Sequence, residues 1–151
     1  MIHRPTLLIV PLLTLFGAGA LVAGCSSNNE TLSQQVRNWA STTGWTSALA
    51  TLTGDLGRVS SVASDSPGVR HTVCDVLVTD ALNDNQQLPT PDRSLTQLLS
   101  RAYTAAANAG RDCYAGGTRL ASAPPEQRQA QRLLVQAQAR YDTVVSSLAI
   151  G

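Results

Sequence analysis

The sequence predicts an all-α protein, built as an antiparallel up-and-down bundle of about four helices. Apolar residues recur at intervals of three and four along most of the chain, which is the spacing of one face of an α-helix. No segment alternates apolar and polar residues with period two, and the Asn-Gly and Asp-Gly pairs typical of tight hairpins do not occur. Amphipathic helices joined by short connections pack most simply side by side in alternating directions.

The first helical stretch begins at Thr31. The residues expected on its buried face are Leu32, Val36, Trp39, Trp45, Leu49, Leu52, Leu56, Val59 and Ala63. Gly44 favours a break or a kink near residues 42–45. Gly54 and Gly57 weaken the second half of the stretch, because glycine is a poor helix former.

The second helix is expected to begin at Ser66-Pro67 and to end near Asn83. Serine is a preferred N-cap, and proline suits the first helical position, where its missing N–H group would have no partner. The apolar positions of this helix are Val69, Val73, Val76, Leu77 and Ala81. Residues 85–91 then form a loop, because Pro89 and Pro91 bias the residues before them away from helix.

The third helix restarts at Thr90-Pro91-Asp92, again as a cap with proline at the first helical position. Its buried face is the clearest in the chain and consists of Leu95, Leu98, Leu99, Ala102, Tyr103, Ala106 and Ala109. This helix either stops at Gly110 or continues to Gly116-Gly117, where glycine would end it.

The last helix opens at Ser122-Ala123-Pro124-Pro125-Glu126. Its inner stripe consists of Ala130, Leu133, Leu134, Ala137, Tyr141, Val144, Val145 and Leu148. Residues 25–151 contain neither Phe nor Met, so we expect a core of Leu, Val and Ala with a few Trp and Tyr rings.

The N-terminus has the features of an export signal. His3 and Arg4 can supply positive charge, residues 6–20 are almost wholly apolar, and small residues follow them. The sequence Val22-Ala23-Gly24-Cys25 at the end of this segment resembles the lipobox of bacterial lipoproteins. In those proteins a peptidase cuts before the cysteine, and lipid is attached to its sulfur.

The resemblance implies a lipoprotein signal peptide at residues 1–24, a lipidated tether at residues 25–30 and a helical domain at residues 31–151. Two acyl chains on Cys25 would give stable attachment to a bilayer, whereas a single chain anchors only marginally. We therefore expect the protein at the cell membrane, anchored by lipid on its extracytoplasmic side.

Residues 6–23 have two alternative interpretations, an uncleaved transmembrane helix and an ordinary cleaved signal. A spanning helix needs roughly 20 apolar residues. This segment is interrupted by Pro11 and two glycines, and no basic cluster follows it. These features favour the lipoprotein signal.

Cys74 and Cys113 are the two cysteines that remain when Cys25 carries lipid. An even pair outside the cytoplasm is typical of a disulfide, and two buried free thiols are the alternative. Closing a loop of roughly 40 residues would stabilise the fold by about 3.5–4 kcal/mol in the chain-entropy model. The bundle is thus expected to contain one disulfide.

This disulfide constrains the second and third helices. In a plain hairpin, Cys74 would face a residue about eleven positions before Cys113, which is about 16 Å along a helix axis. Either the third helix ends near Gly110 and folds Cys113 back, or the proline-containing loop climbs along the second helix. We expect the second arrangement, because residues 84–91 offer enough extended chain.

The charge balance argues against nucleic-acid binding. The chain has eleven arginines and no lysine, and residues 25–151 carry ten arginines against ten acidic residues. A neutral domain lacks the basic patch with which proteins contact phosphate backbones. Nothing in the sequence indicates a cofactor, and no metal-ligand spacing is present, since Cys-x-x-Cys is absent and His71 is the only histidine after the leader.

Two pairs of ionisable residues are candidate sites. His71 and Asp75 share a helical face and could act as an acid–base dyad, but a local pair near a helix start is the favoured interpretation. Asp80 and Asp84 also share a face and could contact a hard cation. Calcium prefers six to eight oxygen ligands, so a solvated face is favoured for this pair.

Arg128 and Arg132 lie one turn apart and could contact an anionic ligand or partner, with an exposed helix face as the simpler interpretation. Trp39 and Trp45 lie near the lipidated end, where indole rings favour membrane interfaces. A core or interhelical role is favoured for both tryptophans.

The segment Leu88-Pro89-Thr90-Pro91-Asp92, followed by Leu95-Thr96, Leu98-Leu99, Ala102-Tyr103 and Cys113-Tyr114, resembles uncharacterised exported proteins of high-GC Gram-positive bacteria. The resemblance implies a helical, disulfide-linked extracytoplasmic domain and no particular activity. We therefore expect a lipid-anchored, non-enzymatic helical module that binds or assembles with an envelope protein. The alternative is a lipoprotein that binds a small hydrophobic ligand or lipid in a cavity inside the bundle.

Overall fold

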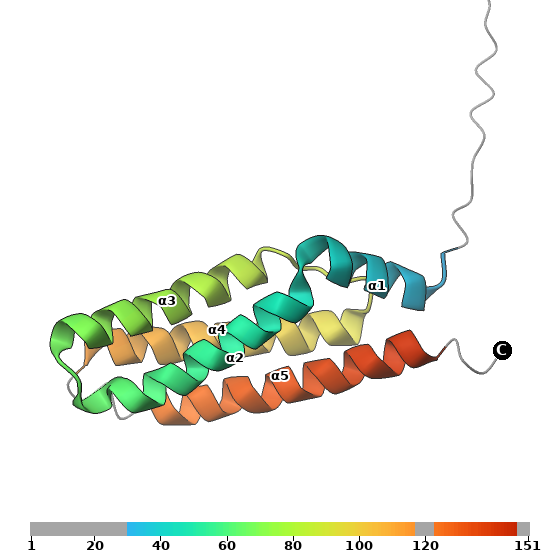
Figure 1. Cartoon of the computed structure of the whole chain (residues 1–151). Coiled ribbons are helices and arrows are strands. Elements are labelled where there is room, and N and C mark those ends of the chain that lie inside the picture. Colours follow the sequence, from blue (N-terminus) through green and yellow to red (C-terminus); the bar gives the residue numbers. More distant parts are fainter. Residues whose placement is uncertain (1–29, 117–122, 148–151) are drawn as a thin grey trace, which may run out of the picture.

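The computed structural model describes residues 30–116 and 123–147, which contain helices and connecting loops but no strand (Figure 1). The elements are α1 (Leu32–Thr43), α2 (Trp45–Ser61), the short 3-10 helix η1 (Val62–Ser64), α3 (Pro67–Asn85), α4 (Arg93–Ala115) and α5 (Ala123–Ser146). The all-α class is confirmed, with five α-helices in these residues rather than about four. None of them is both long and apolar enough to cross a membrane.

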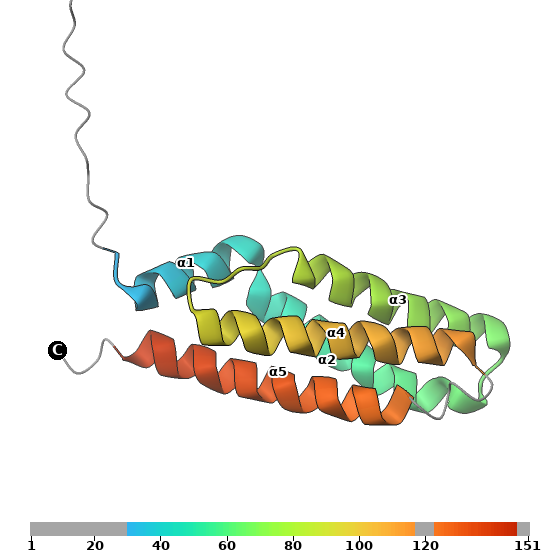
Figure 2. The same cartoon turned by 180° about the vertical axis from the view of Figure 1, so that it is seen from behind.

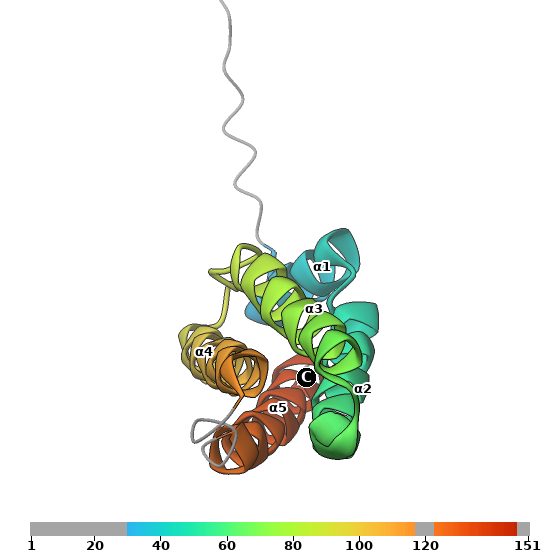
Figure 3. The same ribbon diagram turned by 90° about the vertical axis from the view of Figure 1, so that its left-hand side faces the viewer.

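Helices α2, α3, α4 and α5 lie lengthwise beside one another, and the shorter α1 lies at one end of this bundle (Figure 1). In the end-on view of Figure 3, α3, α2, α5 and α4 follow one another around the bundle. The contacts of α4 are extensive with both α3 and α5, whereas α2 packs on α3 and touches α5 sparsely. The bundle is therefore loosest between α2 and α5.

The break expected near residues 42–45 occurs at Gly44. This residue has a φ of 66°, a left-handed conformation that glycine adopts without strain, and it separates α1 from α2. Helix α2 then continues through Gly54 and Gly57 without interruption. One expected helical stretch thus becomes two helices, which explains the higher helix count.

Helix α1 is fixed to two parts of the bundle, the end of α5 and the loop after α3. The hydroxyl of Ser33 donates to the carbonyl oxygen of Val145 at 3.2 Å, and Arg37 donates to the same oxygen. These bonds satisfy a carbonyl in the last turn of α5, which has no partner within its own helix. At the other side, the indole N–H of Trp39 donates to the carbonyl oxygen of Gln87 at 3.0 Å.

Cys74 and Cys113 are paired, with Cα atoms 5.7 Å apart, a normal separation for a disulfide. Cys74 lies eleven residues before the end of α3, and Cys113 lies twenty residues after the start of α4. At 1.5 Å per residue, α4 must begin about 14 Å beyond the end of α3.

Residues 86–92 provide this offset by running onward past the end of α3, toward α1, before the chain turns into α4 (Figure 2). Both arrangements expected from the sequence are therefore wrong. The loop does not climb back along α3, and α4 does not end near Gly110 but continues to Ala115, with Gly116 as its C-cap.

Gly110 is needed for contact between helices rather than for a helix end. A Cβ atom at this position would lie 2.7 Å from Cγ2 of Val78 and 2.9 Å from the carbonyl oxygen of Cys74. Real Cβ atoms do not approach other atoms so closely. Glycine therefore lets the backbones of α3 and α4 meet one turn before the disulfide.

The start of α4 also differs from the expectation. Its N-cap is Asp92, whose carboxylate accepts a hydrogen bond from the backbone N–H of Leu95 at 2.6 Å, so Pro91 lies outside the helix. Thr90 is buried, and its hydroxyl donates to the carbonyl oxygen of Asp92 at 2.7 Å. The loop therefore enters the helix through side-chain hydrogen bonds.

Leucine, valine and alanine dominate the core, as expected from the composition. Trp45 and Tyr103 are its two fully enclosed rings, with 2% and 3% of their surface exposed. The expectation that Val69 and Val76 face the core was wrong, because both are exposed. Helix α3 instead buries the face that carries Cys74, Leu77 and Ala81.

Candidate functional site

A groove lies between α2 and α5, where the two helices contact each other sparsely. It consists of two hollows of about 390 and about 380 Å³, both of which are lined by Gln131. The first hollow is also lined by Gly57, Val59, Ser60, Ala123, Pro124, Gln127 and Arg128. The second is also lined by Leu49, Thr53, Leu134, Val135 and Gln138. We call the two hollows together the α2–α5 groove.

Two direct contacts join α2 to α5 along this groove. The rings of Trp45 and Tyr141 lie 4.8 Å apart, centre to centre. Further along, the buried side-chain amide of Gln127 donates to the carbonyl oxygen of Leu56 and to the hydroxyl of Ser60. The helices are thus held at two points, with the hollow that contains Leu49 and Leu134 between them.

The expected role of the tryptophans in the core or between helices is supported by these contacts. Trp45 is buried, and its ring lies 5.8 Å from that of Trp39, which is partly buried. Trp39 also bonds to the loop after α3. Neither indole projects freely from the bundle, as an interfacial anchor would require.

The middle of the α2–α5 groove is apolar, and one end is positively charged. Leu49 and Leu134 lie along its floor, and Val135 is 70% exposed at its rim. Arg128 is the only charged residue among those that line the two hollows. Arg132 is also exposed on α5, one turn from Arg128, but it does not line the groove.

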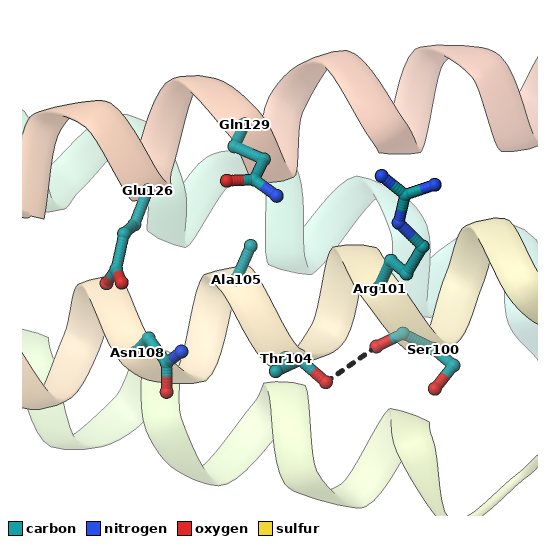
Figure 4. Close-up of a pocket in the computed structure, with 7 residues that line it drawn as sticks. All are labelled: Ser100, Arg101, Thr104, Ala105, Asn108, Glu126 and Gln129. Carbon is teal, nitrogen blue, oxygen red and sulfur yellow. Dashed lines mark hydrogen bonds between the residues drawn. The ribbon is translucent and has the colours of Figure 1, made fainter.

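A third, smaller hollow of about 210 Å³ lies between α4 and α5 (Figure 4). In it, Glu126 points from α5 toward α4, and Arg101 points from α4 toward α5. One carboxylate oxygen of Glu126 is buried without a hydrogen-bond partner, and burial together with the Asp112 charge raises the pKa of Glu126. The hydroxyl of Thr104 donates to the carbonyl oxygen of Ser100, so it is not poised as a nucleophile.

Three carboxyl groups gather between α2 and α3. Asp55 is buried, and its pKa is raised by burial and by contact with Asp80, although Arg58 at 3.6 Å opposes this shift. Burial and the charge of Asp80 also raise the pKa of Asp84 to about 6. The expectation of a solvated face for Asp80 and Asp84 is therefore wrong, since both are partly buried. No set of three or more acidic, His or Cys side chains in the described part of the chain is arranged to hold a metal ion.

His71 and Asp75 do not form the dyad considered from the sequence. The ring of His71 stacks on Tyr114, with ring centres 4.4 Å apart, and Asp75 is exposed. No hydrogen bond or ion pair joins the two residues, both of which the structure describes. The local pair that the sequence favoured near the start of α3 is therefore not formed either.

Sequence reasoning missed the ion pair between Asp92 and Arg140. The guanidinium of Arg140 donates to both carboxylate oxygens of Asp92, at 3.1 and 2.6 Å. Arg140 and the backbone bond from Leu95 hold the pKa of Asp92 below its usual range, although burial opposes this shift. No sequence pattern links residues 48 positions apart, but the pair fixes the start of α4 against α5.

Cys25, the sequence-predicted lipidation site, lies outside the described residues. Comparison with known proteins adds no further assignment, since no family model, curated protein or solved structure matches this chain. The geometry of the bundle itself therefore has to support any functional conclusion, and the α2–α5 groove is the candidate site.

Proposed function

We propose that this protein is a lipid-anchored, non-enzymatic helical module of the cell envelope that binds a partner protein through the α2–α5 groove. The observation that carries the proposal is the position of this groove. It is an apolar depression on the outside of a bundle whose interior is filled by Leu, Val and Ala side chains. Grooves between helices are common sites for binding an apolar partner surface.

We also propose that α2 to α5 form an antiparallel up-and-down bundle. The lipobox-like sequence supports lipid attachment at Cys25. Cys25 precedes the first described residue, Glu30, by five positions, so the lipid would emerge beside α1. The groove between α2 and α5 would then remain available on the extracytoplasmic side.

A second candidate function is binding of a small hydrophobic ligand or lipid. The apolar floor at Leu49 and Leu134, with Arg128 toward one end, would suit an acyl chain that carries an anionic group. Both hollows open at the surface, so such a ligand would lie in the groove rather than in a sealed cavity inside the bundle.

The test of anchoring uses the full chain and a Cys25→Ala variant. In cells fed an alkyne analogue of palmitate, we expect label on the wild-type protein and none on the variant. Crosslinking in intact cells should then recover an envelope partner with the wild type and much less of it with Cys25→Ala. Equal labelling, or an unchanged partner in the variant, would refute the anchored-module proposal.

A further inference from the structure

The outward face of α2 has an unusual composition for a solvated helix. Of its ten exposed residues only Arg58 is charged. Its exposed residues include six small ones, namely Ala50, Thr53, Gly54, Gly57, Ser60 and Ser61. Of these, Thr53, Gly57 and Ser60 line the groove. Exposed helix positions usually carry strong helix formers with long polar side chains, since packing does not restrict the choice there.

The fold itself does not require the two glycines on this face. A Cβ atom at Gly54 or at Gly57 would have no other atom within 4 Å, and neither residue has a positive φ. Glycine in a helix interior is destabilising relative to alanine. Glycine is the usual residue where another backbone or a ligand must approach closely, so an external contact would explain both positions.

This small-residue face is continuous with the α2–α5 groove. Gly57 and Ser60 belong to the face and also line the hollow that contains Arg128. Across the groove, the side chain of Val135 is 70% exposed. A flat helix surface, an apolar groove and an exposed aliphatic side chain therefore lie side by side.

We propose that this combined surface docks an amphipathic helix of the partner protein, with a carboxylate of that helix placed against Arg128. This inference rests on the proposed binding function and names its partner chemistry. A helix is favoured over an acyl chain because only a bulky backbone would need the missing Cβ atoms of Gly54 and Gly57. The acidic character follows from Arg128, the only charged residue that lines the groove.

A second copy of this chain is the less suitable occupant. Its own α2–α5 groove offers no carboxylate that could pair with Arg128. Its α2 face carries only Arg58 as an exposed charge, which would repel the same arginine. Self-association, an acyl chain and a different protein surface are therefore outcomes that the experiment must separate from an acidic helix.

The experiment uses the full chain in its native cells, with a photo-crosslinking amino acid at Thr53 or Val135. Thr79, exposed on α3, is the control position. Mass spectrometry then identifies the crosslinked species. We expect a peptide from an envelope protein with helical periodicity and at least one acidic residue, formed at Thr53 and Val135 but not at Thr79. Crosslinks to phospholipid, to another copy of this chain, to a peptide without acidic residues or to nothing would overturn the inference.

Glycine variants provide the decisive control. We expect Gly54→Ala combined with Gly57→Ala to lower the crosslinking yield about tenfold, a loss of about 1.4 kcal/mol in binding, while raising the thermal stability of the purified protein. Gly68→Ala on α3, where an added Cβ also meets open space, should leave the yield unchanged. A double variant that destabilises the protein, or that crosslinks normally, would contradict the proposed docking.

Charge reversal tests the contact with Arg128. Arg128→Glu should lower the yield more than Arg132→Glu, which changes the same charge outside the groove, and equal effects would refute the pairing. Failure of anchoring is distinguishable from failure of docking. If Cys25→Ala retains the same acidic-helix crosslink, the anchoring proposal fails and the docking inference stands. If the anchored wild-type protein crosslinks to lipid instead, the docking inference fails and the anchoring proposal stands.

Discussion

Gly110→Ala should destabilise this protein although alanine is the better helix former. The new Cβ would lie 2.7 Å from Cγ2 of Val78 and 2.9 Å from the carbonyl oxygen of Cys74. Rotation of the Val78 side chain can relieve the first contact. The second involves backbone that is held in α3 and covalently tied to α4 through Cys113, so it can be relieved only by moving the helices apart.

The size of the effect follows from these distances. Ordinary contact begins at 3.4 Å, so the Cys74 carbonyl oxygen must retreat by about 0.5 Å. A radial gap of about 0.5–1 Å forfeits a quarter to a half of the dispersion energy of the contacts that it opens. Overpacking of this kind costs about 1–3 kcal/mol, and the gain from replacing glycine in a helix is about 0.5–1 kcal/mol. The expected net loss is about 0.5–2 kcal/mol.

The assay is urea denaturation of the purified protein, followed by tryptophan fluorescence. For a slope of about 2 kcal/mol per molar urea, the midpoint of Gly110→Ala should fall by roughly 0.3–1 M. Gly54→Ala, the same substitution where the added Cβ meets nothing, should raise the midpoint. A midpoint for Gly110→Ala at or above that of the wild type would refute the close approach of α3 and α4.

Three further predictions concern charge and the disulfide. Asp84→Asn should raise the free energy of unfolding at pH 7 by about 1 kcal/mol, after allowance for partial exposure. Because the folded pKa of Asp84 is about 6, above the ordinary 3.8, the wild type should lose stability as pH rises through this window, and the variant should lose less in a pH series of urea titrations. Arg140→Ala should cost about 1–3 kcal/mol at pH 7 by leaving Asp92 buried without its partner, and Arg140→Lys should restore only part of it. Since the pKa of Asp92 is lowered, this loss should shrink as pH falls below the usual range of aspartate, and a pH-independent loss would contradict the ion pair. Replacing Cys74 and Cys113 together by alanine should lower the free energy of unfolding by about 2–4 kcal/mol, and an unchanged urea midpoint would show that the cysteines are not bridged.

The helices could be predicted from local patterns, but the offset of α4 relative to α3 along the bundle could not. Gly44 marked the break between α1 and α2, and Pro67 marked the start of α3, because both depend on conformational preferences of single residues. The onward course of residues 86–92 depends instead on a contact with α1, in which the indole N–H of Trp39 donates a hydrogen bond to the carbonyl oxygen of Gln87. No local pattern contains that information.

The candidate site was partly readable from the sequence. Leu49 and Leu134 were expected on inner faces, and Arg128 was singled out as a possible anion contact. The buried Asp55 was missed although it falls on the stripe of Leu52 and Leu56, where period alone would have found it. The groove itself depends on how sparsely α2 and α5 contact each other, which only the packed bundle shows.

Glycine occurs at Gly44, Gly110, Gly54 and Gly57 for different structural reasons, which the sequence alone does not distinguish. Gly44 is explained by its left-handed backbone, and Gly110 is explained by contact between α3 and α4. Gly54 and Gly57 have neither explanation, so alanine should stabilise the free protein at both positions. If the same substitutions weaken the complex, then stability in the free state and affinity for the partner oppose each other at these two positions. Binding of the partner would then explain why α2 keeps two glycines that lower the stability of the free protein.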